Sequence, residues 1–112
     1  MQLQTKRVGE VDVIVPSGSI HAEDVPPFDE ALSALRRRSR FTVVIDASDL
    51  DYVNSRAIGL LVQFARDARL GGGKIALVRP GPGVEKILRA VGLLSLIPAY
   101  DTVDQAVAAC SE

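Results

Sequence analysis

The sequence predicts an α/β fold in which a mixed sheet of four or five strands packs against about four helices. Two observations support this prediction. Residues 3–8 and 11–15 read as short strands on either side of Gly9-Glu10, which is typical of an antiparallel hairpin. Beyond residue 25, apolar runs alternate with helical stripes, and such β-α-β crossovers make the later strands parallel. The chain has 112 residues, 47% of them apolar, and is expected to form one domain over residues 1–112.

The first helix is expected to begin near Pro26-Pro27, because proline is tolerated in a first turn. Its apolar residues recur at helical spacing and should face the core: Phe28, Ala31, Leu32 and Leu35. The arginines at 36–40 suit the negative end of the helix dipole, and we expect them to be solvated. The β-branched run at 41–45 then predicts a strand buried on both faces.

The second helix is predicted from Ser55 to Leu70, and the glycines at 71–73 end it. Its buried stripe comprises Ile58, Leu61, Val62, Ala65 and Ala68. A strand is expected at 74–78. A third helix follows the loop 80–83 and ends at Gly92, with a buried stripe of Val84, Ile87, Leu88 and Val91.

The C-terminal part is expected to add a short strand near Leu96-Ile97 and a last helix. Thr102 and Gln105 have the spacing of a capping box at the start of that helix. Its apolar stripe comprises Val103, Ala106, Val107 and Cys110, which predicts that Cys110 lies in the core.

Composition excludes several classes of protein. A net charge of −1 argues against a general nucleic-acid binder, which would carry a basic face. Cys110 is the single cysteine, so an intrachain disulfide is impossible, as expected in a reducing compartment. The N-terminal residues lack the apolar core of a signal peptide, and no apolar run approaches the roughly 20 residues of a membrane span. We therefore expect a cytoplasmic protein that is not embedded in a membrane.

The segment between the strand at 41–45 and the second helix is the most informative part of the chain. It is a short acidic loop that ends at Asn54-Ser55, where the helix begins. The amino end of a helix has free N–H groups and the positive end of the helix dipole. Asn54 or Ser55 can simply cap that end. Alternatively, Ser55 can accept a phosphate, which the free N–H groups would stabilise. Both interpretations can hold together.

The other candidate constellations are weaker. Asp46, Asp49 and Asp51 could bind a divalent ion or accept a phosphoryl group, but turn-forming, solvated acids are favoured. His21 is the single histidine, and nothing local pairs it with Ser55 as a catalytic base. The glycines at 71–73 and the loop 79–83 have the wrong spacing for phosphate or dinucleotide loops. The 79–83 loop could still form part of a ligand or partner surface beside the Ser55 loop. No catalytic residue, metal ligand or cofactor is predicted.

The chain resembles the STAS domain family, in its anti-sigma factor antagonist type. The strand at 43–46 ends in an acid, and residues 49–61 then read D-L-D-Y-V-N-S-R-A-I-G-L-L. The family motif is roughly D-L-x-x-[IV]-[DN]-[ST]-[SA]-[GA]-[LI]-x-x-[LF]. Residues 73–78, 84–88 and 91–93 are similar too, so that the resemblance covers nearly the whole chain and implies a STAS-like mixed sheet.

The resemblance implies a bacterial signalling protein that regulates transcription by partner switching. In the family, the residue matching Ser55 is phosphorylated by a partner serine kinase, often an anti-sigma factor. The unphosphorylated form binds that partner, and a phosphatase of the PP2C type resets the switch. ATP belongs to the kinase, so this chain needs no cofactor. The expected partner-binding surface surrounds the start of the second helix: Asp46, Asp49, Asn54, Ser55, Arg56, Ile58 and Gly59.

Three residues depart from the family pattern. Asn54 replaces the commoner Asp, Arg56 occupies a position that is usually small, and Ala57 stands where Gly is common. Arg56 could hold a phosphate, select a different partner or block the usual kinase. Two alternatives stay open. One is a stand-alone STAS subunit of a lipid or anion transport system, in which Ser55 is only a cap. The other is a small phosphotransfer or hydrolase enzyme, for which the sequence supplies no base or metal site.

Overall fold

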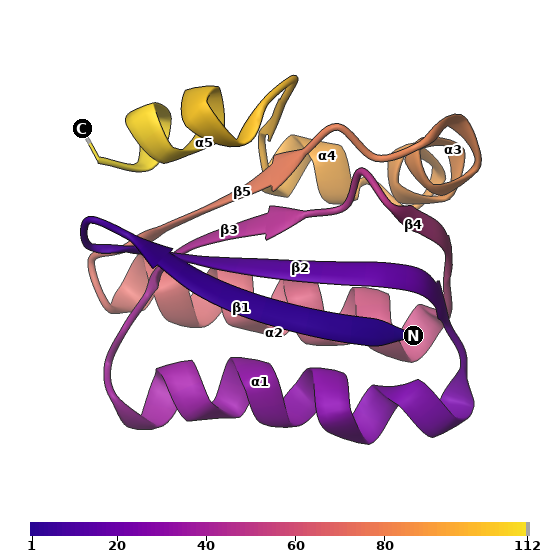
Figure 1. Ribbon diagram of the computed structural model, residues 1–112, viewed down its shortest axis with the longest axis horizontal. Helices are drawn as coiled ribbons and strands as arrows, with labels where there is room; N and C mark the ends of the chain where they lie inside the picture. The colour runs from indigo at the N-terminus through magenta and orange to yellow at the C-terminus, as the bar shows by residue number, and fades with distance from the viewer. Residues whose placement is uncertain (112) are drawn as a thin grey trace.

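A mixed sheet of six strands separates helices on its two faces in the computed structural model, which describes residues 1–111 (Figure 1). The strand order is β1-β2-β3-β5-β6, and β4 pairs with β2 off this path. Helices α1 and α2 cover one face, and α5 covers the other (Figure 1). The predicted α/β fold with a mixed sheet is confirmed.

The hairpin turn and the parallel strands at Thr42–Asp46 and Lys74–Val78 lie where the sequence predicts them. β1 and β2 are antiparallel from Gln2↔Ser17 to Val8↔Val11, whereas the other pairings are parallel. Gly9 has a φ of +61°, a backbone conformation that glycine adopts without strain in a tight turn. The strands are β1 (Gln2–Val8), β2 (Val11–Ile20), β3 (Thr42–Asp46), β4 (Leu50–Val53), β5 (Lys74–Val78) and β6 (Ala99–Tyr100).

The helices also begin and end close to their predicted positions. The bounds of α2 agree with the prediction at both ends. Gly92 follows α3 with a φ of +78°, the left-handed conformation in which many helices end. The helices are η1, a 3₁₀ turn (Ala22–Asp24), α1 (Val25–Arg37), α2 (Ser55–Leu70), α3 (Pro82–Ala90), α4 (Leu93–Leu96) and α5 (Val103–Cys110).

The core lies in two layers on either side of the sheet. The larger layer packs β2, β3 and β5 against α1 and α2, with Phe28, Leu32 and Phe64 almost fully buried. Burying one such side chain contributes roughly 1.5–3 kcal/mol. The smaller layer packs the opposite face of these strands against α5 and includes Val44 and Cys110. The prediction that residues 41–45 are covered on both faces and that Cys110 is a core residue is confirmed.

Together with the short turns η1 and α4, β4 is an element that the sequence did not predict. Leu50 and Val53 are buried, while Asp51 and Tyr52 between them are exposed. Asp49 and Asp51 made this segment resemble a loop in the sequence. In the structure, the buried side chains of Leu50 and Val53 hold it as a short strand. β2 accordingly runs on to Ile20 rather than ending at residue 15, and its register against β4 shifts between Gly18 and Ser19.

The predictions for the C-terminal third need three corrections. Leu96 ends the single turn α4, and the last strand lies at Ala99–Tyr100 instead of near Leu96-Ile97. Val91 is 57% exposed because α3 ends at Ala90, before the predicted stripe is complete. Only half of the predicted capping box forms. Thr102 accepts a hydrogen bond from the Gln105 N–H, but the Gln105 side chain accepts from the Asp101 N–H.

The arginines in the last turn of α1 and just after it are only partly solvated, contrary to the prediction. Arg36 donates to Asp67 of α2 at 2.7 Å, and Arg40 donates to the buried Asp12 of β2. Arg37 and Arg38 are exposed. Two of the four thus hold the end of α1 to its neighbours. No helix within residues 1–111 is both long enough and apolar enough to cross a bilayer.

Candidate functional site

β4 leads directly into the start of α2. Buried Leu50 and Val53 fix the two ends of this short strand. The loop before it is held by backbone hydrogen bonds, because the Leu50 N–H donates to the Ala47 carbonyl and the Gly18 N–H donates to the Asp49 carbonyl at 3.0 Å. The helix start therefore has a fixed position relative to the sheet.

Asn54 caps α2, and Ser55 is the first helical residue. The Asn54 side chain accepts a hydrogen bond from the Ala57 N–H at 2.9 Å, and its backbone is extended, as an N-cap requires. Ser55 is exposed. By helix geometry the N–H groups of Ser55 and Arg56 have no acceptor within the helix. The Ser55 side chain thus lies in solvent at the positive end of the helix dipole.

The residues around Ser55 divide into a buried support and an exposed surface. Ala57 and Ile58 are buried against the core and hold the first turn in place. Arg56 and Gly59 are exposed. Gly59 lies four residues after Ser55, so the two share one helix face. An added Cβ at Gly59 would meet no atom within 4 Å. Ile58, expected in the partner surface, supports that surface from beneath.

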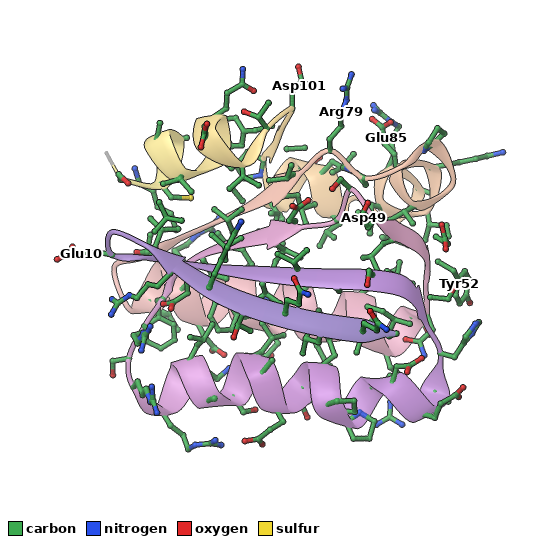
Figure 2. The ribbon with its side chains drawn as sticks, viewed as in Figure 1. Glu10, Asp49, Tyr52, Arg79, Glu85 and Asp101 are labelled. Atoms are coloured by element: carbon green, nitrogen blue, oxygen red, sulfur yellow. The ribbon has the colours of Figure 1, made fainter. Side chains whose placement is uncertain are left out.

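The acidic residues of this segment do different things. Asp46 is half-buried and accepts hydrogen bonds from the Ser48 N–H at 3.1 Å and the Ser48 hydroxyl at 2.6 Å. It therefore shapes the turn after β3. Asp49 and Asp51 are exposed, and Figure 2 labels Asp49 in the loop between β3 and β4. Within residues 1–111, no three acidic, histidine or cysteine side chains gather as metal ligands.

The sequence did not predict an aromatic pair near the start of α2. Tyr52 of β4 is 40% exposed and projects from the surface (Figure 2). Its ring stacks on that of His21, with the ring centroids 5.2 Å apart. The backbone N–H of His21 donates to the Asp24 carboxylate. This hydrogen bond lowers the pKa of Asp24 and fixes the short turn that carries His21. The one sequence feature that could have indicated this pair is Tyr52 itself, an aromatic residue in an acidic segment three residues before Ser55.

A cavity of about 610 Å³ lies at the carboxyl ends of β3, β5 and β6. Residues 79–82 of the predicted loop line it together with Ser48, Glu85 and Asp101. Arg79 and Asp101 form an exposed ion pair at 3.7 Å, and Figure 2 shows both on the same side of the molecule. Gly81 lies beside the Leu50 carbonyl, since an added Cβ would be 3.7 Å from that oxygen. The loop therefore lies beside the segment that leads to Ser55, as expected from the sequence.

Comparison with known proteins agrees with this architecture. A Thermotoga maritima protein that is provisionally named an anti-sigma factor antagonist is 24% identical over 102 residues, which are 90% of each chain. The crystal structure of an anti-sigma factor antagonist from Mycobacterium paratuberculosis has a TM-score of 0.89 at 24% identity, over 99% of this chain and 94% of that one. The phosphorylated form of the Bacillus cell fate determinant SpoIIAA has a TM-score of 0.77 at 21% identity, over 96% and 98%.

The family assignment rests on a direct match along the sequence. The model of the STAS domain matches residues 2–106. The match spans β1 to the first half of α5 and includes β4 and the start of α2. The chain therefore belongs to the STAS domain family.

Proposed function

We propose that this protein is a regulatory binding protein of the anti-sigma factor antagonist type, switched by phosphorylation of Ser55. One observation carries the proposal. Asn54 caps α2, so Ser55 is exposed at the start of the helix and is not used as the cap. The names of the relatives support the same role, and SpoIIAA has been solved in unphosphorylated and phosphorylated forms.

A phosphate at this position would change the surface electrostatically. It adds about −1.5 to −2 charges to an exposed surface that follows the acidic segment carrying Asp49 and Asp51 in the sequence. The free N–H groups of the first turn and the exposed Arg56 can stabilise it within this chain. A partner that docks on the uncharged surface must then desolvate an anion, which weakens the complex.

The partners that fit this proposal are a serine kinase of the anti-sigma type and a phosphatase of the PP2C type. The kinase binds the ATP, so this chain contributes the acceptor hydroxyl and the docking surface rather than catalysis. Such a circuit operates in the cytoplasm, where ATP is available. The proposed docking surface comprises Ser55, Arg56 and Gly59, with Asp46, Asp49, Asn54 and Ile58 shaping or supporting it.

Phosphorylation of the purified protein tests the proposal. Incubation with ATP and the anti-sigma-type kinase of its own organism should place phosphate on Ser55, as mapped by mass spectrometry. Ser55→Ala should abolish the modification, whereas Ser48→Ala, at a second exposed serine nearby, should leave it intact. Phosphate at another position, with Ser55→Ala fully competent, removes the proposal. Stable co-purification with a permease or transport ATPase, unaffected by Ser55 variants, would instead favour the transport-subunit alternative.

A further inference from the structure

The edge of the sheet at β1 is open along its length. β1 is the terminal strand, and six of its seven residues are exposed. Val8 and Val11 flank the two-residue turn and therefore form a hydrogen-bonded pair. From this pair onward, hydrogen-bonded and non-hydrogen-bonded residue pairs alternate between β1 and β2. Lys6 and Gln4 therefore bond to β2. The N–H and C=O groups of Leu3, Thr5 and Arg7 point away from the sheet.

A groove runs between this edge and α1. It has a volume of about 460 Å³. Thr5 and Arg7 of β1 line one side, and Ala31, Ala34 and Leu35 of α1 line the other. Thr5 pairs with Ile14 of β2, whose side chain belongs to the core layer under α1, so Thr5 faces the same layer. The groove thus combines an apolar wall with a row of free backbone donors and acceptors.

The charges that line the groove are mainly positive. Arg7 comes from β1, while Arg38 and Arg40 follow the end of α1. Lys6 also borders the groove, but it pairs with Val13 of the layer under α5, so its side chain lies on the opposite face of the sheet. Only two carboxylates face them, and both already have partners. Asp12 accepts from Arg40 at 3.1 Å and lies 3.8 Å from Arg7. Glu30 pairs with Arg37 at 2.7 Å. The groove therefore has an excess of positive charge.

We propose that this groove binds an extended, acidic segment of a partner protein, which adds a strand to β1. In strand addition, main-chain hydrogen bonds to a free edge give affinity, and alternate side chains enter the groove beside it. Charges on an edge strand alone can serve to prevent aggregation. Here, Arg38 follows α1, lines the same groove and has no acidic partner within residues 1–111. Arg7 must share Asp12 with Arg40. An acidic peptide satisfies both the free backbone groups and the unbalanced cations.

This surface is distinct from the proposed switch at Ser55. None of the residues that line the groove belongs to the surface around the start of α2. The inference can therefore hold whether or not Ser55 is phosphorylated. A partner segment bound at β1 would leave Ser55 accessible. One protein could then bind the groove while another binds the surface around Ser55.

The test uses a short, capped, fluorescein-labelled peptide in which Glu alternates with Val. Fluorescence anisotropy should show saturable binding at low salt, and amide NMR shifts should concentrate on β1 and α1. A peptide with Lys in place of Glu should bind at least roughly tenfold more weakly, the equivalent of one lost charge contact. Arg38→Glu should weaken the Glu peptide and strengthen the Lys peptide.

Thr5→Pro is the sharpest variant, because it removes an outward N–H and leaves the ladder to β2 intact. It should abolish binding, whereas Thr5→Ala should retain it. Thermal unfolding of both variants checks that the hairpin still forms, and a second proline-free variant, Arg7→Glu, should also weaken binding. Equal affinity for the Glu and Lys peptides overturns the proposal. So does self-association through β1 in sedimentation experiments.

Discussion

The Asn54 side chain accepts a hydrogen bond from the Ala57 N–H at 2.9 Å. This contact lets the two interpretations of the helix start be separated experimentally, because the capping role and the proposed acceptor role fall on neighbouring residues. Asn54 holds the helix start, and Ser55 presents its side chain to solvent.

We expect Asn54→Ala to lower the free energy of unfolding by about 1 kcal/mol, within the usual range of roughly 0.5–2 kcal/mol for a lost N-cap. Ser55→Ala should change it by less than about 0.5 kcal/mol, as is usual for an exposed side chain. Urea denaturation followed by circular dichroism measures both. Equal losses in the two variants would mean that Ser55 shares the capping role.

Ser55→Asp is expected to weaken binding of the anti-sigma-type partner by about 1–3 kcal/mol, through charge repulsion and desolvation of the carboxylate. Ser55→Asn is the matched control, since it has nearly the same shape without the charge. Isothermal titration calorimetry with the purified partner gives the affinities. If the Asp and Asn variants bind equally well, charge at this position does not control docking.

Gly59→Ala separates stability from binding. Gly59 lies inside α2, and an added methyl group would meet no atom of this chain. Replacing a mid-helix glycine should therefore raise the free energy of unfolding by about 0.4–1 kcal/mol. If Gly59 lies in the docking surface, as we propose, the same methyl group should reduce the affinity of the partner for this protein. A variant that is more stable and binds with unchanged affinity would place Gly59 outside the interface.

Most of the fold could be predicted because hydrophobic periodicity is a strong signal over long elements. The α2 stripe and its terminal glycines give both ends of the helix, and the β-branched run at 41–45 gives a buried central strand. Val91 shows the limit of this approach. It has the correct helical spacing, but α3 ends one residue earlier and leaves Val91 exposed.

The candidate site could be predicted only in part, because pairing partners are tertiary information. Asp51 and Tyr52 read as a loop, yet β2 extends past Gly18 and gives that segment a strand to pair with. The same pairing carries Tyr52 into contact with His21, which lies far away in the sequence. Composition cannot show such a contact. Which side chain caps α2 also depended on backbone geometry that the Asn54-Ser55 pair leaves open.

Gly73→Ala should destabilise the protein, in contrast to Gly59→Ala. A Cβ at Gly73 would approach the Phe41 carbonyl oxygen to 2.2 Å and its carbonyl carbon to 2.5 Å. Relief requires movement of the backbone at Phe41, just before β3, and overpacking of this kind typically costs about 1–3 kcal/mol. Gly83→Ala is the control, because its Cβ would meet no atom within 4 Å. Chemical denaturation of both variants should show a lower midpoint for Gly73→Ala alone.

The buried thiol of Cys110 should make stability fall at alkaline pH. Burial raises the pKa of Cys110 above its ordinary value, with the charge of Lys74 acting weakly in the opposite direction. Above the ordinary thiol pKa of about 8.5, the unfolded chain therefore binds fewer protons than the folded one, and the free energy of unfolding decreases as pH rises. Cys110→Ala lacks this contribution, and its packing cost does not depend on pH. We expect the wild type to lose stability relative to Cys110→Ala between neutral pH and about pH 10, beyond the ordinary thiol pKa, as measured by urea denaturation. Parallel stability curves for the two proteins would show that the thiol ionises equally easily in both states, which contradicts its burial between α5 and the sheet.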